Sequence, residues 1–233
     1  MTRIIAGTLG GRRIAVPPKG TRPTTDRVRE AIFSRLDHEN RLRGSWVLDA
    51  FAGSGALGLE ALSRGAKRAI FVESNPAAVA VIRANAESVG VTKATEVARD
   101  KILPWLGRST RPVDLATFDL ALLDPPYDLP PEELAATLAA LVPRLTARAA
   151  VVVEWSSRSE APAWPKGLVA SESKRYGETT VHYAVASGAA ALGDDAAGDD
   201  VAGDNPGDGA SGRNPADKTP PSGSSGKRDS LKR

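Results

Sequence analysis

The chain has 233 residues, of which 41% are hydrophobic, so it is long enough to bury a core in one or two domains. The absence of cysteine excludes disulfides, a thiolate nucleophile and cysteine-based metal sites, and the two histidines stand apart from any ligand-spaced cluster, so we expect no metal. There is no run of 18 apolar residues and no apolar leader, from which we expect a cytoplasmic protein with no membrane partner.

The first 43 residues are expected to form a small basic extension ahead of the main domain. The β-prone runs on either side of Gly10-Gly11 suit a hairpin turn. A Pro-rich loop then leads to a helix that Thr24 or Thr25 can cap. The whole chain has a net charge of +3, but residues 1–46 hold ten Arg or Lys against four Asp or Glu, which favours an anionic partner; a solvated basic face is the alternative.

Strands and helices then alternate along the chain, as judged from apolar runs and helical spacing. The expected strands are 46–50, 69–72, 94–98, 120–123 and 149–154, with helices beginning near residue 56 and covering 76–88 and 131–145. This order predicts an α/β fold with a parallel sheet and right-handed crossovers. The last two runs, 168–174 and 179–186, are joined by a short turn and must therefore pair antiparallel.

A glycine-rich stretch follows the first of these strands. Its glycines allow a tight turn and close approach of the backbone to a ligand, at the free N–H groups of a helix N-terminus. Gly53, Gly55 and Gly58 also satisfy the dinucleotide fingerprint, and Glu73 lies 20 residues after Gly53. An NAD-type site is therefore one alternative for this turn.

The fourth strand ends in Asp124-Pro125-Pro126-Tyr127. The prolines end the strand and leave a carboxylate, a stiff corner and a ring at the carboxyl edge, where ligands sit in open α/β sheets. This set suits a planar amine. Asp124 and the Pro125 carbonyl can accept its two N–H groups and turn its lone pair toward an electrophile, and Tyr127 can stack a base. A Pro-rich turn with Asp124 as a cap is the alternative.

Three features favour S-adenosylmethionine over NAD as the cofactor. Asp49 would repel a pyrophosphate but suits an amino-acid ammonium group, Asp100 is placed after the third strand to meet an adenine amino group, and the residues from Asp124 to Tyr127 have no role in hydride transfer. With either cofactor, Glu73 would bind ribose hydroxyls. A helix cap for Asp100 and a solvated loop acid for Glu73 are the alternatives.

Taken together, these residues resemble the RsmD-type 16S ribosomal RNA guanine-N2 methyltransferases, which belong to the Rossmann-like S-adenosylmethionine-dependent class. The resemblance covers residues 2–186 and rests on the stretches 3–7, 22–30, 49–65, 124–127 and 175–177. Many amino-methyltransferases, DNA adenine enzymes included, share 49–65 and 124–127, whereas 22–30 is the more specific signal. The resemblance implies a seven-stranded, mostly parallel sheet with an antiparallel last strand and helices on both faces.

The resemblance also implies methyl transfer from S-adenosylmethionine to a guanine 2-amino group in 16S rRNA, free or in an assembling 30S subunit, by a chain we expect to be a monomer. The catalytic residues would be Asp124, Pro125, Pro126 and Tyr127. The cofactor would be bound by Asp49, Phe51, Ala52, Gly53, Ser54, Gly55, Glu73, Ser74 and Asp100. The RNA would be bound by Arg22, Thr24, Thr25, Arg27 and Arg29, with a solvated helix face as the alternative for the arginines.

Two other functions stay open. A DNA or other RNA amino-methyltransferase acting on adenine N6 would share the Asp-Pro-Pro-Tyr site, and a non-catalytic RNA-binding module would share the basic front of the chain. We expect three parts: an RNA-binding extension (1–43), a methyltransferase domain (44–186) and a tail (187–233). The tail is rich in Gly, Asp, Ser and Pro and poor in large apolar residues, so we expect it to be disordered.

Overall fold

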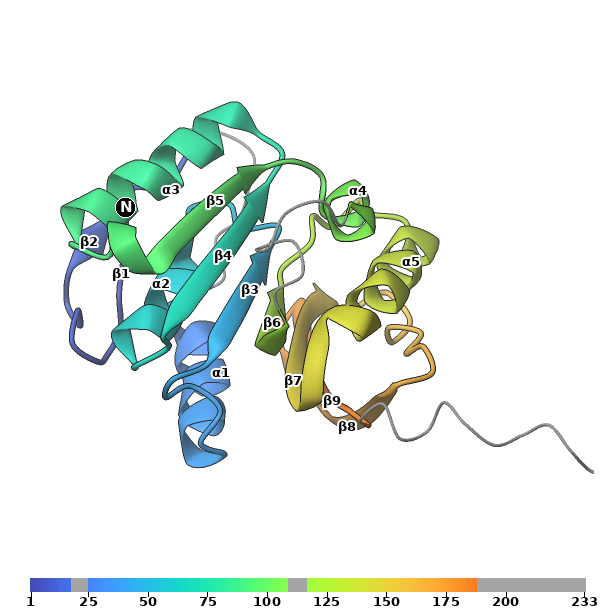
Figure 1. Cartoon of the computed structure of the whole chain (residues 1–233). Coiled ribbons are helices and arrows are strands. Elements are labelled where there is room, and N and C mark those ends of the chain that lie inside the picture. Colours follow the sequence, from blue (N-terminus) through green and yellow to red (C-terminus); the bar gives the residue numbers. More distant parts are fainter. Residues whose placement is uncertain (18–24, 109–116, 188–233) are drawn as a thin grey trace, which may run out of the picture. The chain divides into compact units, whose positions relative to one another are not determined.

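A computed structural model describes residues 1–17, 25–108 and 117–187, all of which belong to one compact unit (Figure 1). Arg22, Thr24 and all of the expected tail after Ser187 lie outside the described residues. Within the described ranges, no helix is long and apolar enough to cross a membrane.

A seven-stranded sheet lies at the centre of this unit, with the strand order β5-β4-β3-β6-β7-β9-β8. Its strands are β3 (Trp46–Ala50), β4 (Arg68–Glu73), β5 (Thr95–Arg99), β6 (Phe118–Leu123), β7 (Leu145–Ser156), β8 (Leu168–Tyr176) and β9 (Thr179–Ala186). Neighbours from β5 to β7 run parallel, and β9 is antiparallel to both β7 and β8. The predicted sheet, with its antiparallel last strand, is confirmed.

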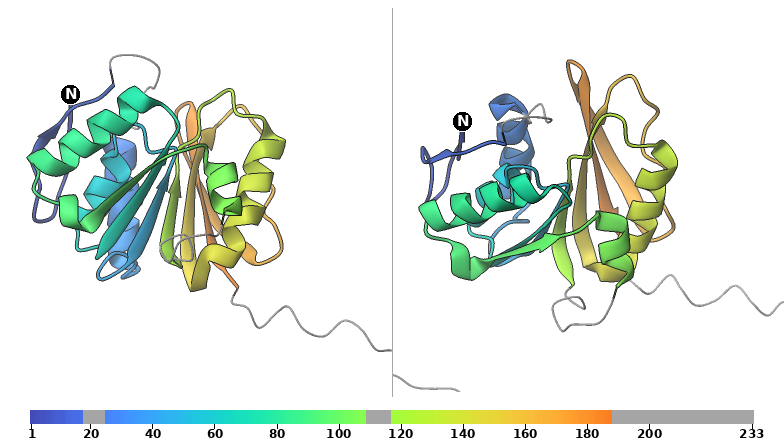
Figure 2. Two further views of the ribbon diagram at one scale, coloured as in Figure 1. Left: turned by 45° about the horizontal axis from the view of Figure 1, so that its top comes forward. Right: turned by 90° about the horizontal axis from the view of Figure 1, so that it is seen from above.

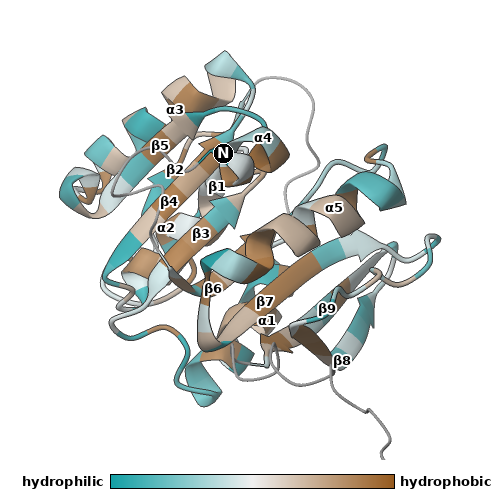
Figure 3. Cartoon of the chain, turned by 45° about the vertical axis from the view of Figure 1, so that its right-hand side comes forward, coloured by the Kyte–Doolittle hydropathy of each residue, from teal (hydrophilic) through white to brown (hydrophobic). Residues whose placement is uncertain are grey.

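Helices cover both faces of the sheet (Figure 2). One face is covered by α1 (Asp26–His38), α2 (Ala56–Ser63) and α3 (Pro76–Ser88), and the other by α4 (Ile102–Gly107) and α5 (Pro131–Leu141). Successive side chains of β6 alternate between the two cores: Leu120 and Leu122 pack on the first, Ala121 and Leu123 on the second. Burial on both faces explains the unbroken apolar runs, which are brown along β3, β4 and β7 in Figure 3.

Some boundaries differ from the expected ones. The helix expected to reach residue 145 ends at Leu141 and continues as a 3₁₀ turn, Val142–Arg144, because Pro143 cannot donate the next helical hydrogen bond. The following strand, β7, is twice as long as its expected core of 149–154. The helix α4 was not expected, since its six residues are too few to show a helical period.

The basic extension begins with a small antiparallel hairpin of β1 (Thr2–Arg3) and β2 (Arg13–Ile14). Its strands are shorter than the expected runs because the backbone amides of Ile5 and Ala6 leave the hairpin. They donate to the buried carboxylate of Glu60 on α2, at 2.6 and 3.1 Å. Thr25 caps α1 by accepting from an amide of its first turn, as one of the two expected caps. The extension therefore shares a core with the sheet.

Candidate active site

A cavity of about 640 Å³ opens at the carboxyl edge of the sheet. The chain moves outward from β3 through β4 to β5, then crosses back to place β6 on the other side of β3. The strand order thus changes direction between β3 and β6, which is where open α/β sheets bind ligands. The volume is within the range of small-molecule and cofactor sites.

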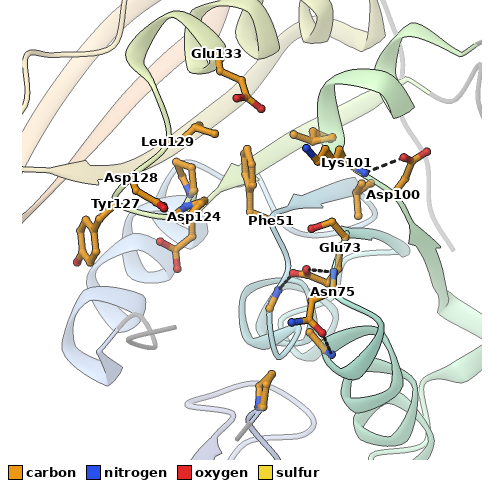
Figure 4. A pocket seen from close by; sticks show the side chains of 18 of the residues that line it. Phe51, Glu73, Asn75, Asp100, Lys101, Asp124, Tyr127, Asp128, Leu129 and Glu133 are labelled. Carbon is orange, nitrogen blue, oxygen red and sulfur yellow. Dashed lines mark hydrogen bonds between the residues drawn. The ribbon is translucent and has the colours of Figure 1, made fainter. Parts of the chain in front are cut away.

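The predicted catalytic residues and five of the predicted cofactor residues meet at this cavity. Its lining includes the predicted catalytic residues Asp124, Pro125, Pro126 and Tyr127 and the predicted cofactor residues Phe51, Gly53, Glu73, Ser74 and Asp100. Figure 4 shows Asp124 and Tyr127 on one side of the Phe51 ring, with Glu73 and Asp100 on the other. The sheet brings together residues that lie far apart in the sequence.

Glu73, at the end of β4, fixes the glycine turn to the next loop. Its Oε2 accepts from the amide of Gly53 at 2.8 Å, and its Oε1 accepts from the amide of Asn75 at 2.7 Å (Figure 4). Each carboxylate oxygen keeps a free lone-pair direction, so Glu73 can also accept from two ribose hydroxyls. The turn depends on such support because Phe51, a non-glycine residue, has a left-handed φ of 60°.

The amides of the turn are used within the protein itself. Gly53 donates to Glu73, Gly55 donates to the carbonyl of Ala52 at 2.7 Å, and Gly58 donates to Asp49 Oδ2 at 2.8 Å. A dinucleotide site needs such N–H groups to face a pyrophosphate at the helix N-terminus. With its three glycine amides occupied and carboxylates around it, this turn suits a nucleoside without phosphate better than NAD.

Asp49 lies behind the turn and is 1% exposed. Burial raises the pKa of its carboxyl well above the usual range, and the nearby Asp124 and Glu73 carboxylates raise the pKa further, while the bond from the Gly58 amide acts in the opposite direction. Asp49, like the predicted cofactor residues Ala52, Ser54 and Gly55, is not among the residues that line the cavity. Its contact with an ammonium group stays a prediction.

Asp124 and Tyr127 form a more open wall. Asp124 is half-buried directly after β6, Pro125 is buried, and Tyr127 is 55% exposed. The Tyr127 hydroxyl lies 3.2 Å from Thr179 Oγ1, at the start of β9. The ring is thus held at one end, and its exposure leaves surface on which a planar base can stack.

Asp100 follows β5 at the far end of the cavity. Its Oδ1 accepts from the amide of Lys101 at 2.8 Å, and its other oxygen pairs with Arg108. The amide of Lys101 lies outside the first turn of α4, and α4 has no side-chain cap, so Asp100 is not the helix cap considered as its alternative. A contact with an adenine amino group stays a prediction.

The expected RNA-binding residues differ in their surroundings. Arg27 is exposed on α1, and Thr25 is exposed as its cap. Arg29 requires a correction, because its side chain is 1% exposed and cannot meet a phosphate at the surface. Its guanidinium instead donates to the carbonyl of Arg3 at 2.7 Å and to Asp26 at 2.8 Å, which ties α1 to the hairpin. Burial lowers the pKa of Arg29 from its usual value.

Several lining residues were missed in the sequence. Asn75 caps α3 and is followed by a proline, a pattern that could have placed it at the helix start beside the cavity. Lys101, Leu129 and Glu133 follow strand ends without a distinctive pattern, and Pro17 reaches the cavity from the distant extension. No group of three or more potential metal-binding side chains occurs in the described part of the chain.

Comparison with known proteins gives concordant matches. The family model described as conserved hypothetical protein 95 matches residues 2–185. A protein of Bacillus subtilis strain 168 named putative rRNA methyltransferase YlbH is 34% identical over 180 residues, which cover 77% of this chain and 96% of that protein.

A second relative, from Haemophilus influenzae, is named ribosomal RNA small subunit methyltransferase D. It is 39% identical over 127 residues, which span 54% of this chain and 63% of that protein. Among solved structures, a putative methyltransferase yhhF from Escherichia coli matches with a TM-score of 0.69 and 30% identity, covering 80% of this chain and 98% of that one. The match with the solved structure thus extends over nearly all of that chain.

Proposed function

The chain belongs to the conserved hypothetical protein 95 family of RsmD-type methyltransferases, and from this premise we propose that it methylates the 2-amino group of a guanine in small-subunit ribosomal RNA. It is an S-adenosylmethionine-dependent rRNA methyltransferase, as the names of its relatives and its methyltransferase fold support. The observation that supports methyl transfer to an exocyclic amine is the meeting of Asp124–Tyr127 with the glycine turn and Glu73 at one cavity, and the resemblance to the RsmD-type enzymes favours guanine as the base that carries this amine.

The cofactor side of the cavity would hold S-adenosylmethionine, which supplies an electrophilic methyl group on its sulfonium. Glu73 would accept from the ribose hydroxyls, and Asp100 would lie near the adenine. Asp49, behind the turn, would offset the ammonium charge. Support comes from the carboxylates at this edge and from the three glycine amides, which donate within the chain and are therefore not offered to a pyrophosphate.

The base side would orient the amine. The Asp124 carboxylate and the Pro125 carbonyl would accept the two N–H groups of the guanine 2-amino group, so that its lone pair points at the methyl carbon. Tyr127 would stack the base, and Pro126 would hold the corner rigid. The methylated nitrogen is strongly acidic until it loses a proton, so no base of matched pKa is needed, and catalysis would come from orientation and proximity.

The guanine would have to be unpaired or turned out of its helix to reach this cavity. The extension would hold phosphates through the exposed Arg27 and through Arg22, which lies outside the described residues. We further propose that residues 1–43 bind RNA and 44–186 carry the chemistry, that the enzyme acts as a cytoplasmic monomer, and that its substrate is 16S rRNA, free or in an assembling 30S subunit.

One experiment tests this function against its rivals. The full chain is incubated with labelled S-adenosylmethionine in three separate reactions. Their substrates are 30S subunits from cells lacking the protein, naked 16S rRNA and duplex DNA. The products are digested for nucleoside mass spectrometry. We expect N2-methylguanosine from the ribosomal substrates and none from DNA. N6-methyladenosine in any of the reactions would make adenine the target in place of guanine. Binding of RNA without any methylation would favour the alternative function, a non-catalytic RNA-binding module.

A further inference from the structure

Asn85, on α3, is a buried amide that holds backbone groups from two distant parts of the chain. Its side chain is 3% exposed. Its Oδ1 accepts from the amide of Ala15 at 2.8 Å, and its Nδ2 donates to the carbonyls of Ala15 and Ser54, both at 2.9 Å. Because an amide N–H can only donate and a carbonyl can only accept, these three partners require the side chain of an asparagine in this orientation.

The bond to Ser54 fixes a peptide of the glycine turn at both ends. The Ser54 carbonyl points to Asn85, and the N–H of the same peptide, from Gly55, donates to the carbonyl of Ala52 at 2.7 Å. The turn contains three left-handed residues, with φ of 60° at Phe51, 55° at Gly53 and 78° at Gly55. Such a backbone keeps one conformation only where its surroundings determine it. Asn85 is not among the cavity-lining residues, so it acts on the cavity through the turn.

The bonds to Ala15 fix the other partner, the basic extension. Pro17, two residues after Ala15, lines the same cavity as Gly53. Other bonds of the extension lead elsewhere: the amides of Ile5 and Leu9 donate to side chains of α2, and Arg12 donates to a carbonyl just after α3. Among the hydrogen bonds of the described residues, those of Asn85 join the extension to the turn.

We propose that Asn85 is a positioning residue that couples the two ligands, so that RNA held by the extension and cofactor held by the turn each strengthen the binding of the other. The proposal rests on the function proposed above. RNA that steadies the extension steadies Ala15, and through Asn85 the Ser54 peptide. Thermodynamic linkage then requires the cofactor to tighten RNA by the same factor. Alanine at this position would leave the Ser54 carbonyl, whose bond to Asn85 is buried, and the part-buried N–H and carbonyl of Ala15 without this partner.

The first test uses the unmodified full chain and amide hydrogen exchange. S-adenosylhomocysteine serves as the probe for the cofactor site. We expect its binding to slow the exchange of the Ala15 amide about fivefold or more, a typical coupling factor. The Leu9 amide, which donates to Ser63 of α2, is the control, and its exchange rate should change less than about twofold.

Each outcome of this test separates the two proposals. If S-adenosylhomocysteine does not bind, the proposed function fails. If it binds and Ala15 is unaffected, or if Leu9 is slowed equally, the coupling role of Asn85 is overturned and the proposed function stands.

The second test compares two variants that each remove a buried polar side chain bonded to the extension. Asn85→Ala removes the link to the turn, whereas the matched control Ser63→Ala removes contacts of the same extension with α2 that do not reach the turn. Calorimetry measures the dissociation constant of S-adenosylhomocysteine with and without transcribed 16S rRNA, after circular dichroism has established that each variant is folded.

In the wild type we expect rRNA to tighten S-adenosylhomocysteine about fivefold or more. Asn85→Ala should lower the affinity for S-adenosylhomocysteine about tenfold and bring the effect of rRNA on that affinity close to none. Ser63→Ala should keep the affinity for S-adenosylhomocysteine within about twofold of wild type and retain the coupling. Equal effects of the two variants, or full coupling in Asn85→Ala, would overturn the role. Should Asn85→Ala not fold, the exchange experiment decides.

Discussion

The two sides of the cavity are built in different ways. On the cofactor side, Asp49 is buried and Glu73 has both oxygens occupied by backbone amides, so the geometry exists before any ligand binds. On the base side, Tyr127 is 55% exposed and its hydroxyl reaches Thr179. Under the proposed function, the cofactor would meet a preformed turn, while a base that must first leave its RNA helix would meet an open wall that the base itself completes.

The largest expected effect lies on the open side. Asp124→Ala should lower kcat about 10²–10³-fold, because one of the two acceptors that orient the amine is lost. The dissociation constant of S-adenosylhomocysteine should stay within about twofold, since in the proposed function Asp124 contacts the base and not the cofactor. Asp124→Asn, which keeps the shape and loses the charge, is the matched control. Activity above a tenth of wild type in the alanine variant would end the amine-orienting role.

A second change tests the preformed side. Glu73→Gln retains the shape of the side chain but replaces one acceptor oxygen with an NH₂ group, so one of the two backbone amides it holds loses its partner. We expect the affinity for S-adenosylhomocysteine to fall about 10–100-fold, the usual effect of losing a hydrogen bond to a charged group, with kcat at saturating cofactor much less affected. A fall in kcat with unchanged cofactor affinity would contradict the division of roles.

The two arginines on α1 separate folding from RNA binding. Arg29→Ala should lower the free energy of unfolding by about 2–3 kcal/mol, because the carbonyl of Arg3 and the carboxylate of Asp26 lose a buried, charged partner. Arg27→Ala, on the exposed face of the same helix, should leave stability within about 0.5 kcal/mol. It should also weaken RNA binding. The slope of the logarithm of the binding constant against the logarithm of the salt concentration should become smaller by about one. Urea unfolding and RNA titrations at several salt concentrations measure both, and reversed effects would restore Arg29 as the RNA contact.

These arginines also show how far the sequence predicts the molecule. Strands and most helices follow from apolar runs, because in a parallel sheet both faces are buried and the pattern is local. The sequence also places Asp124–Tyr127 and Glu73 at strand ends, and parallel strands bring such ends to one edge. The burial of Arg29 is not local. It depends on a hairpin that docks on α1 from 26 residues away.

The same limit applies to the glycine turn. Its glycines predict a tight turn, but they do not reveal that its amides are occupied by Asp49 and Glu73, nor that Asn85 fixes it from behind. Asn85 gave no signal, since one asparagine within a helix has no spacing that identifies a partner. Hydrogen bonds between a side chain and a distant backbone group are decided by packing. A single sequence does not identify the two partners.

Burial of Asp49 predicts opposite effects on stability and on binding. A carboxyl whose pKa is raised by folding contributes stability below its unfolded pKa, and that contribution is lost as pH rises through the folded pKa. Asp49→Asn cannot ionise, so its stability advantage over wild type should grow as pH rises above about 4, measured as an increasing difference in Tm. Affinity for S-adenosylhomocysteine should fall instead, because the variant has no carboxylate to offer in the proposed contact with the ammonium group. A lower Tm at all pH values would contradict this account.

The smallest expected effect returns to the open wall. Tyr127→Phe removes the hydroxyl near Thr179 and keeps the ring, so if stacking is the role of this residue, kcat/KM should stay within about twofold of wild type. Tyr127→Ala removes the ring and should raise KM for RNA about 5–100-fold, as expected from a base-stacking contribution of about 1–3 kcal/mol. Steady-state kinetics with rRNA as the varied substrate distinguish the two. If the phenylalanine variant were as impaired as the alanine variant, the wall would depend on its hydroxyl anchor, and the base side would be preformed in the same sense as the cofactor side.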